Sequence, residues 1–380
     1  MVSIINYIKS FLTYGDLAAA EKIGYTADKS EWPNYKVVII PNDHLGKDII
    51  LPDFSNIAPL LEDKTYIIEN DIIYTTFFFI SRAEELLTTE RDEHGRFNAK
   101  YSILGQNNRL QIPLLDEYAR TILKLLELPL PKAGFNKIYL THDVDTIANY
   151  RHLRGFIGGL LREGWDTVMK SVQDIQKDPA YTFPWLVWQD KKVPNAESIY
   201  FIKDTKGKGF DYPQYNLRGK DFLRLKKYLE SNNARLGLHS SYYGTLPKNN
   251  EFKLHRSHYL RCSIDQMQRL ADAGITDDFT MSFPDMAGFR LQTTRAVRWI
   301  NPKTMKLTNL TLHPLTVMDC TLSNANYMNL TETEAFYYCQ QLFDKVQMHH
   351  GDLCLLWHNS NPAGNPWQHS IYTQLLDLIK

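Results

Sequence analysis

Two carboxylates stand two residues apart at the end of an apolar run, residues 138–145 (Ile-Tyr-Leu-Thr-His-Asp-Val-Asp). Side chains alternate along an extended chain, so we expect Asp143 and Asp145 on one face and His142 and Val144 on the other. Two such carboxylates either bind a cation or leave one member with a raised pKa, because like charges repel at short distance. The alternative is a polar cap between a strand and a helix, since Asp and Thr are common helix N-cap residues.

Four later clusters carry side chains that bind ions or exchange protons. They are residues 236–244 with His239, 254–261 with His258, 284–290 with Arg290, and 353–359 with His358. Histidine titrates near neutral pH and is a common metal ligand, while arginine binds anions. Each cluster also has a structural alternative. An isolated histidine is more often hydrogen-bonded in a core, and Arg290 is also suited to pair with a buried acid such as Asp143.

The pattern after residue 131 alternates strand-like runs with amphipathic segments. The expected strands are residues 137–143, 198–202, 235–239, 278–283, part of 307–319, and 352–358; the expected helices are 165–176, 219–232, 263–274 and 331–349. Such alternation predicts a parallel sheet or barrel with helices outside. Sites in these folds form at the carboxyl ends of the strands. Asp143, Asp145, His239 and His358 all fall at such ends, so we expect them to converge.

The first 130 residues form a separate unit in the sequence. Its expected strands are residues 36–40, 48–51, 66–68 and 72–80, and helices are expected to begin at Ser81 and Pro113. The charged segment 91–97 is interpreted as a solvated loop. Residues 128–134 hold two prolines and a glycine, which interrupt helix and strand alike. We therefore predict a smaller α/β domain over residues 1–130 and a larger domain over residues 131–380.

Composition restricts the classes of function. Lys plus Arg equals Asp plus Glu, at 43 each, which argues against a nucleic-acid partner or a general attraction to anionic membranes, although local basic patches are compatible with this balance. The longest apolar run, residues 72–80, is too short to span a bilayer, and the N-terminus lacks the pattern of a signal peptide. The four cysteines lack the paired spacing of a thiolate zinc site. These features predict a cytoplasmic protein with free thiols.

Taken together, the clusters resemble a family, the polysaccharide deacetylases with the NodB-homology domain. Residues 141–145 (Thr-His-Asp-Val-Asp) resemble the first motif of a subgroup that has an extra N-terminal domain, and residues 238–241 (Leu-His-Ser-Ser) resemble the second motif. Residues 288–290 (Gly-Phe-Arg) resemble the arginine motif, and residues 356–359 (Leu-Trp-His-Asn) the terminal histidine motif. The resemblance covers about residues 137–370, and residues 78–97 are similar to the N-terminal domain of the same subgroup.

The resemblance implies a distorted (β/α) barrel and hydrolysis of an N-acetyl or O-acetyl group on a sugar, assisted by a divalent metal ion, with zinc as the expected ion. It also implies the site roles: Asp143 as base, His358 as acid, Arg290 as the residue that orients the base, and Asp145 and His239 as metal ligands.

The chain departs from the family pattern at two positions. Val144 separates two aspartates that are usually adjacent, so the division into base and ligand stays open. Tyr243 stands where the family has a second histidine. Zinc usually has three protein ligands and one open position in catalytic sites. From ligand chemistry we therefore expect His258 to supply the missing ligand, with His142 as the next candidate.

These departures keep two other functions in view. One is a carbohydrate-binding or scaffold protein that has kept the barrel and lost the metal. The other is an amidase of the same fold that acts on a substrate other than a sugar.

Overall fold

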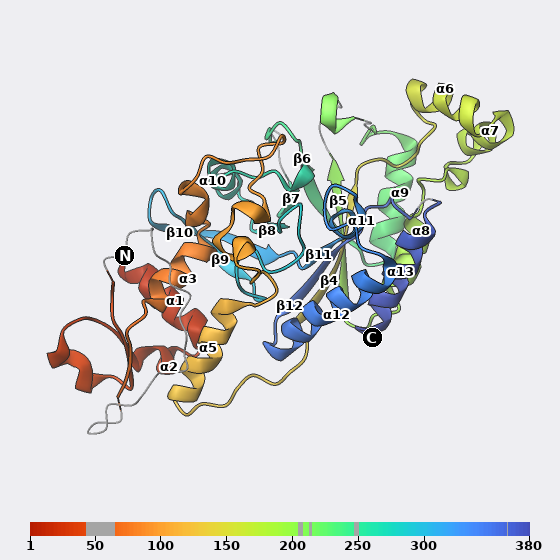
Figure 1. The fold of residues 1–380 in the computed structure, drawn as a ribbon. Helices are drawn as coiled ribbons and strands as arrows, with labels where there is room; N and C mark the ends of the chain where they lie inside the picture. Colours follow the sequence, from red (N-terminus) through yellow and green to blue (C-terminus); the bar gives the residue numbers. More distant parts are fainter. Residues whose placement is uncertain (43–64, 204–207, 213–214, 247–250, 363) are drawn as a thin grey trace.

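A nine-stranded sheet forms the centre of the computed structural model, which describes residues 1–42, 65–203, 208–212, 215–246, 251–362 and 364–380. In spatial order its strands are β11 (Val317–Met318), β12 (Asp352–Leu356), β4 (Lys137–Val144), β5 (Ala196–Lys203), β6 (Arg235–Ser240), β7 (Leu254–Ser257), β8 (Asp277–Met281), β10 (Lys306–Pro314) and β9 (Val297–Asn301). Neighbours are parallel except β10 and β9. The parallel-rich α/β class predicted from the sequence is therefore confirmed (Figure 1).

The described strands form an open ladder that runs from β11 to β9, not a closed barrel. One continuous segment, residues 306–318, nevertheless pairs with strands in two separate parts of the sheet. Its first part, β10, pairs with β8; after two intervening residues, β11 pairs with β12. Between them the Thr316 N–H donates to the Cys354 carbonyl at 3.0 Å. The barrel expected from the family resemblance stays a prediction.

The register aligns the carboxyl ends of the central strands. Val144 of β4 pairs with Ile202 of β5, and Lys203 of β5 pairs with His239 of β6. Side chains that follow these positions therefore emerge along one edge of the sheet, where parallel α/β proteins place their sites. Seven of the eight residues of β4 are buried, as the apolar run predicts.

Helices cover the sheet and account for most of the amphipathic segments expected from the sequence. They are α6 (Leu153–Arg162), α7 (Trp165–Gln173), α8 (Phe183–Asp190), α9 (Lys220–Ser231), α10 (Ile264–Asp272), α11 (Asp319–Ser323), α12 (Glu332–Met348) and α13 (Pro366–Asp377), with the 3₁₀ turns η5 (Ile175–Lys177), η6 (Gly209–Asp211) and η7 (His258–Leu260). The longest, α12, begins at a capping box in which Thr331 and Glu334 bond each other's backbone. No helix in the described ranges is long and apolar enough to cross a membrane.

The N-terminal segment forms a small parallel sheet with short helices around it. Its elements are α1 (Val2–Leu12), α2 (Leu17–Glu21), β1 (Ile23–Tyr25), η1 (Lys29–Asn34), β2 (Val37–Ile39), β3 (Tyr66–Ile68), α3 (Ile72–Ile80), η3 (Ala83–Leu86), η4 (Ala99–Tyr101), α4 (Ile103–Gln106) and α5 (Leu114–Leu125). One hydrophobic core joins this segment to the large sheet, for Phe78 and Tyr118 share a cluster with Met267 and Trp299. The division expected near residue 130 stays a prediction.

Several expectations for individual elements need correction. Residues 72–80 form helix α3 and not a strand, because an all-apolar run carries no period and Asp71 caps the helix by accepting from the Tyr74 N–H at 2.8 Å. The helix expected from Ser81 is the short turn η3, which begins two residues later. Strands β7 and β9 were not predicted. The strand expected at residues 48–51 lies outside the described residues.

Candidate metal centre and active site

Three potential metal ligands converge at the carboxyl ends of β4, β6 and β7. Asp145 Oδ1 lies 3.2 Å from His258 Nε2 and 3.5 Å from His239 Nε2. The ligand atoms of the three residues all lie within 4.8 Å of one another. Zinc–nitrogen and zinc–oxygen bonds of about 2.0 to 2.2 Å at tetrahedral angles separate neighbouring ligand atoms by about 3.3 Å. The spacing therefore fits a shared divalent ion.

Hydrogen bonds orient both histidines toward this position. His239 Nδ1 lies 3.1 Å from the Arg256 carbonyl, and His258 Nδ1 lies 2.9 Å from Asp211 Oδ1. Both partners are acceptors, so each Nδ1 carries a hydrogen, and each ring in its neutral form presents a lone pair at Nε2. Asp145 Oδ1 and His239 Nε2 are buried and make no hydrogen bond with the described residues. A cation satisfies acceptors that no hydrogen bond satisfies.

Local backbone geometry delivers His258, the replacement predicted for the missing histidine. His258 is the first residue of η7, directly after β7, where Tyr259 and Leu260 have φ values of 61° and 55°. These left-handed residues turn the chain sharply at the strand end. Tyr243, by contrast, is about half exposed, at 46%.

Asp211 completes the support of the metal position and was missed in the sequence. Its carboxylate accepts from Ser241 Oγ at 2.6 Å and from the Tyr242 N–H at 2.8 Å, in addition to its bond with His258. Burial opposes ionisation, but these bonds lower the pKa of Asp211 to about 2. Residue 211 lies in a loop between expected elements, so no periodic signal marks it.

Asp143 occupies a different place from Asp145. Its Oδ1 accepts from the Arg256 guanidinium at 3.1 Å, while its Oδ2 lies 3.6 Å from His239 Nε2 and 4.0 Å from His358 Nε2. Burial alone would raise the pKa of Asp143, but the neighbouring His239 and the guanidinium of Arg256 lower it. Asp143 is therefore held ionised, with one oxygen anchored and the other facing the site.

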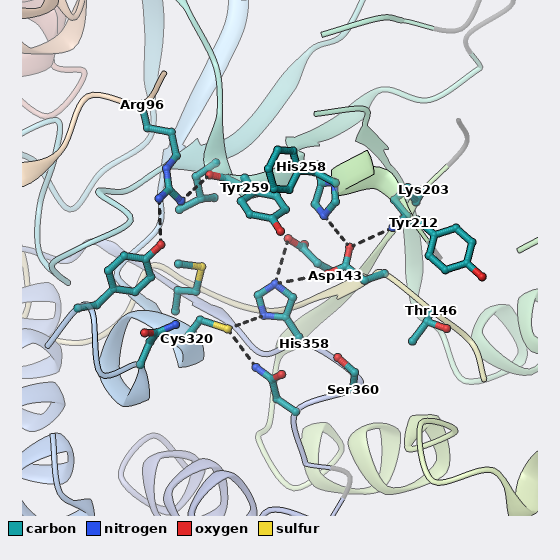
Figure 2. A pocket seen from close by; sticks show the side chains of 17 residues that line it. Arg96, Asp143, Thr146, Lys203, Tyr212, His258, Tyr259, Cys320, His358 and Ser360 are labelled. Atoms are coloured by element: carbon teal, nitrogen blue, oxygen red, sulfur yellow. Dashed lines mark hydrogen bonds and ion pairs between the residues drawn. The ribbon is translucent and has the colours of Figure 1, made fainter. Parts of the chain in front are cut away.

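His358 is oriented by Asp319, which follows β11. Asp319 Oδ1 lies 2.8 Å from His358 Nδ1, and Asp319 Oδ2 accepts from the His358 N–H at 2.8 Å. Burial opposes protonation, but the Asp319 carboxylate raises the pKa of His358 well above its usual value. The imidazole is thus protonated near neutral pH, with Nε2 directed at the two aspartates (Figure 2).

Two residues considered in the sequence lie elsewhere. Arg290 donates to Glu85 Oε1 at 2.6 Å and to the Ser282 carbonyl at 2.8 Å, and Arg256 takes the place beside Asp143 that was expected for Arg290. His142 points to the other side of β4, where its Nε2 lies 3.0 Å from Asp190. The alternation of side chains along the strand thus separates His142 from the aspartates, as expected.

Lys203 is a further charged residue at this position. Its side chain is 1% exposed, and its Nζ lies 3.8 Å from Asp145 Oδ1 without a hydrogen-bond partner among the described residues. Burial lowers the pKa of Lys203, and the nearby Asp145 opposes this shift. In the sequence, the position of Lys203 at the end of an apolar, strand-like run was the feature that could have placed it near the site.

The converging residues open into a cavity of about 430 Å³ with walls from both parts of the chain. Figure 2 shows Arg96 of the N-terminal segment above this cavity, where it donates to the Tyr327 hydroxyl at 2.9 Å and to the Tyr259 carbonyl at 3.3 Å. Residues 91–97 form a loop, as expected, but Arg96 and Phe97 are buried, so the expectation that solvent surrounds the whole segment is wrong. The N-terminal segment therefore helps to build the site.

A family profile described as "Family of unknown function (DUF7033)" matches residues 5–131. No curated protein matches the chain. A solved structure, described as a "putative polysaccharide deacetylase from Mycobacterium smegmatis", has a TM-score of 0.40 and 11% sequence identity, covering 66% of this chain and 88% of that one.

Proposed function

We propose that the protein is a metal-dependent hydrolase that removes an acetyl group from a carbohydrate. One observation carries the proposal: Asp145 Oδ1, His239 Nε2 and His258 Nε2 converge at zinc-like spacing, beside an ionised aspartate and a protonated histidine. Such a set combines a Lewis-acid position, a base and an acid around one cavity.

The donor set supports zinc as the ion. Two neutral imidazole nitrogens and one carboxylate oxygen leave a fourth position open, which is the usual arrangement of catalytic zinc. When bound, a divalent ion there would polarise the acetyl carbonyl and make the attacking water more acidic. Asp211 and the Arg256 carbonyl would keep the imidazoles of His258 and His239 turned to it.

Asp143 is proposed as the base that takes the proton of the attacking water. Its Oδ2 faces the site, and Arg256 fixes its Oδ1 and keeps the carboxylate ionised. Asp145 directs its Oδ1 at both histidines and is therefore proposed as the ligand. With Val144 between them, the two carboxylates share one face of the strand and divide the two tasks.

His358 is proposed as the acid that protonates the leaving nitrogen or oxygen as the acetyl C–N or C–O bond breaks. Its Nε2 lies 4.0 Å from an oxygen of each aspartate, on the cavity side. Asp319 keeps the ring in one orientation and favours the protonated form. This is the role that a base–acid pair requires of its second member.

The rim of the cavity supports a carbohydrate substrate. Phe210, Tyr212 and Tyr259 line it and are each more than a third exposed, which offers aromatic faces for sugar rings. The described cysteines are free thiols, which supports the cytoplasmic setting expected from the sequence.

The test is acetate release from acetylated sugars by the metal-loaded protein. A panel of N-acetylglucosamine oligomers and O-acetylated oligosaccharides separates amide from ester substrates, and acetylated peptides test the amidase alternative. The proposal expects release from at least one sugar class that stops on chelation and returns with zinc. Release from the peptides alone would contradict the sugar assignment.

Lys203 favours a second candidate function, a carbohydrate-binding protein without metal. The Lys203 ammonium, 3.8 Å from Asp145 Oδ1, offsets the negative charge of Asp145, which a bound metal ion would otherwise offset. Zinc binding separates the two functions. The hydrolase takes up one ion and keeps it in Lys203→Met, whereas the binding protein takes up none and binds sugar unchanged after chelation.

A further inference from the structure

Helix α6 presents an apolar face to solvent. Leu153, Ile157 and Leu161 are 76%, 50% and 83% exposed, and residues four positions apart lie on one side of a helix. Trp165, at the start of α7, is also exposed, at 63%. Figure 1 shows α6 and α7 projecting from the body of the molecule.

The opposite side of α6 is held against the protein. Gly159 is buried there, and a Cβ at this position would lie 2.6 Å from the Tyr150 ring and 2.9 Å from Val168. Only glycine allows this close approach. The packing therefore fixes which side of α6 faces inward, and the row of exposed leucine and isoleucine side chains faces outward.

The charges beside the apolar face are basic. Within α6 the charged side chains are Arg154 and Arg162, both exposed, and Arg151 precedes the helix with Asp221 as its partner at 3.5 Å. The acids Glu163 and Asp166 follow only at the turn into α7. A short helix with an apolar face flanked by arginine is suited to the boundary of acyl chains and anionic headgroups.

The apolar face adjoins the rim of the candidate site. The Tyr212 hydroxyl lies 2.8 Å from Nδ1 of His152, the N-cap residue of α6, and the Arg154 guanidinium lies 5.7 Å from the centre of the Tyr212 ring. Tyr212 also lines the cavity (Figure 2). Whatever covers α6 therefore lies beside the cavity mouth.

We propose that this face, defined as Leu153, Ile157, Leu161 and Trp165 with Arg154 and Arg162, docks on an anionic phospholipid surface. The contact is peripheral, because the helix has ten residues and lies along the interface. Docking brings the rim of the cavity to the lipid surface. The proposal goes beyond the proposed function, and it rests on the exposed face and its charges alone.

The test is co-sedimentation of the full chain with lipid vesicles. Vesicles of phosphatidylcholine alone are compared with vesicles that contain about one third phosphatidylglycerol, at low salt and at about 1 M salt, where screening shortens electrostatic range to about 3 Å. We expect binding to the anionic vesicles that weakens with salt. The double variant Leu153→Gln/Leu161→Gln should bind at least about tenfold more weakly, and Arg154→Gln/Arg162→Gln about tenfold or more.

Matched variants and an oligomer measurement make the test decisive. Leu17→Gln/Leu223→Gln changes two leucines that are 69% and 51% exposed elsewhere, and Lys226→Gln/Lys303→Gln removes the same charge elsewhere; both should bind as wild type does. The proposal is wrong if wild-type protein binds neither kind of vesicle. It is also wrong if wild-type protein is a dimer that Leu153→Gln/Leu161→Gln turns into a monomer. Vesicle binding is measured with metal-loaded and with metal-free protein. Because the proposal rests on the surface of α6 alone, both forms should bind equally, whether or not the protein releases acetate.

Discussion

Two buried clusters of charged side chains in this protein differ in one physical respect. In the first, Glu85 accepts from the Arg82 and Arg290 guanidinium groups, which also donate to the Cys262 and Ser282 carbonyls. In the second, the acceptors Asp145 Oδ1 and His239 Nε2 and the amine of Lys203 are buried without hydrogen-bond partners in the described structure.

The comparison teaches how to separate a structural ion network from a functional site. A buried charge whose hydrogen bonds are complete is explained by stability alone, since leaving it unpaired would be costly. Buried polar atoms that make no hydrogen bond are instead candidates for ligand binding, and two oriented imidazoles beside a carboxylate support the proposed metal ion. Charge alone does not distinguish the clusters, because both combine acidic with basic side chains.

The largest expected effect breaks the second cluster at the proposed base. Asp143→Asn should lower kcat for acetate release by about 10³-fold or more, because the amide cannot take the proton of water. The metal content should stay at the wild-type value, since Asp145 and not Asp143 is the proposed ligand. Asp116→Asn, the same change in a buried carboxylate that binds Thr293 and Thr294, is the control and should keep its activity. Full activity of Asp143→Asn would refute the assignment.

The next effect breaks the first cluster. Arg290→Met should lower the free energy of unfolding by about 3 to 5 kcal/mol, because it removes one partner of the buried Glu85. Denaturation by urea measures the loss, and zinc content of the folded fraction should not change. If Arg290→Met has normal stability but no activity, Arg290 has the catalytic role that the sequence predicted and not the structural role assigned here.

A smaller effect concerns the proposed acid. His358→Gln should lower kcat about 10²-fold. Because Asp319 raises the pKa of His358, the protonated form persists above neutral pH, and its loss should lower activity on the alkaline side. Asp319→Asn removes the raising charge, so that alkaline limb should move to lower pH. An unchanged pH profile in Asp319→Asn would contradict the proposed pairing.

The smallest effect concerns Glu84, a buried acid next to Glu85 of the first cluster. Glu84 accepts hydrogen bonds from Ser102 Oγ and the Ile103 N–H. Burial raises the pKa of Glu84 to about 7. The folded state therefore binds a proton more tightly than the unfolded state, and stability should fall as pH rises from about 4.5 to 7. Glu84→Gln removes this titration. Its stability relative to wild type should be higher at pH 8 than at pH 4.5, by up to about 3 kcal/mol in urea denaturation. Equal pH dependence in both proteins would refute it.

Much of the fold was predictable because parallel strands and amphipathic helices leave periodic signals. The apolar run before Asp143 and the amphipathic helix α5 are examples. Helix α3 was not predictable from period, since all nine of its residues except Tyr74 are buried. The helix-capping residue Asp71 was the sequence feature that indicated a helix there.

The candidate site was predictable where the proposed ligands stand at strand ends, as Asp145 and His239 do. It was not predictable where the partner of a charge decides its role. Arg256 and Arg290 are both arginines near strand ends, and only the fold shows which one meets Asp143. Asp211 and Asp319 support histidines across 47 and 39 residues of sequence, a separation that no local pattern records.

Metal stoichiometry tests the central claim most directly. Purified protein dialysed against zinc and analysed by atomic emission should hold one ion per chain, and His258→Ala should hold almost none. Arg290→Met, which alters the other cluster, should keep one ion in its folded fraction. Wild-type protein that takes up no zinc, nickel, cobalt or iron, or His258→Ala that binds zinc as wild type does, would contradict the account.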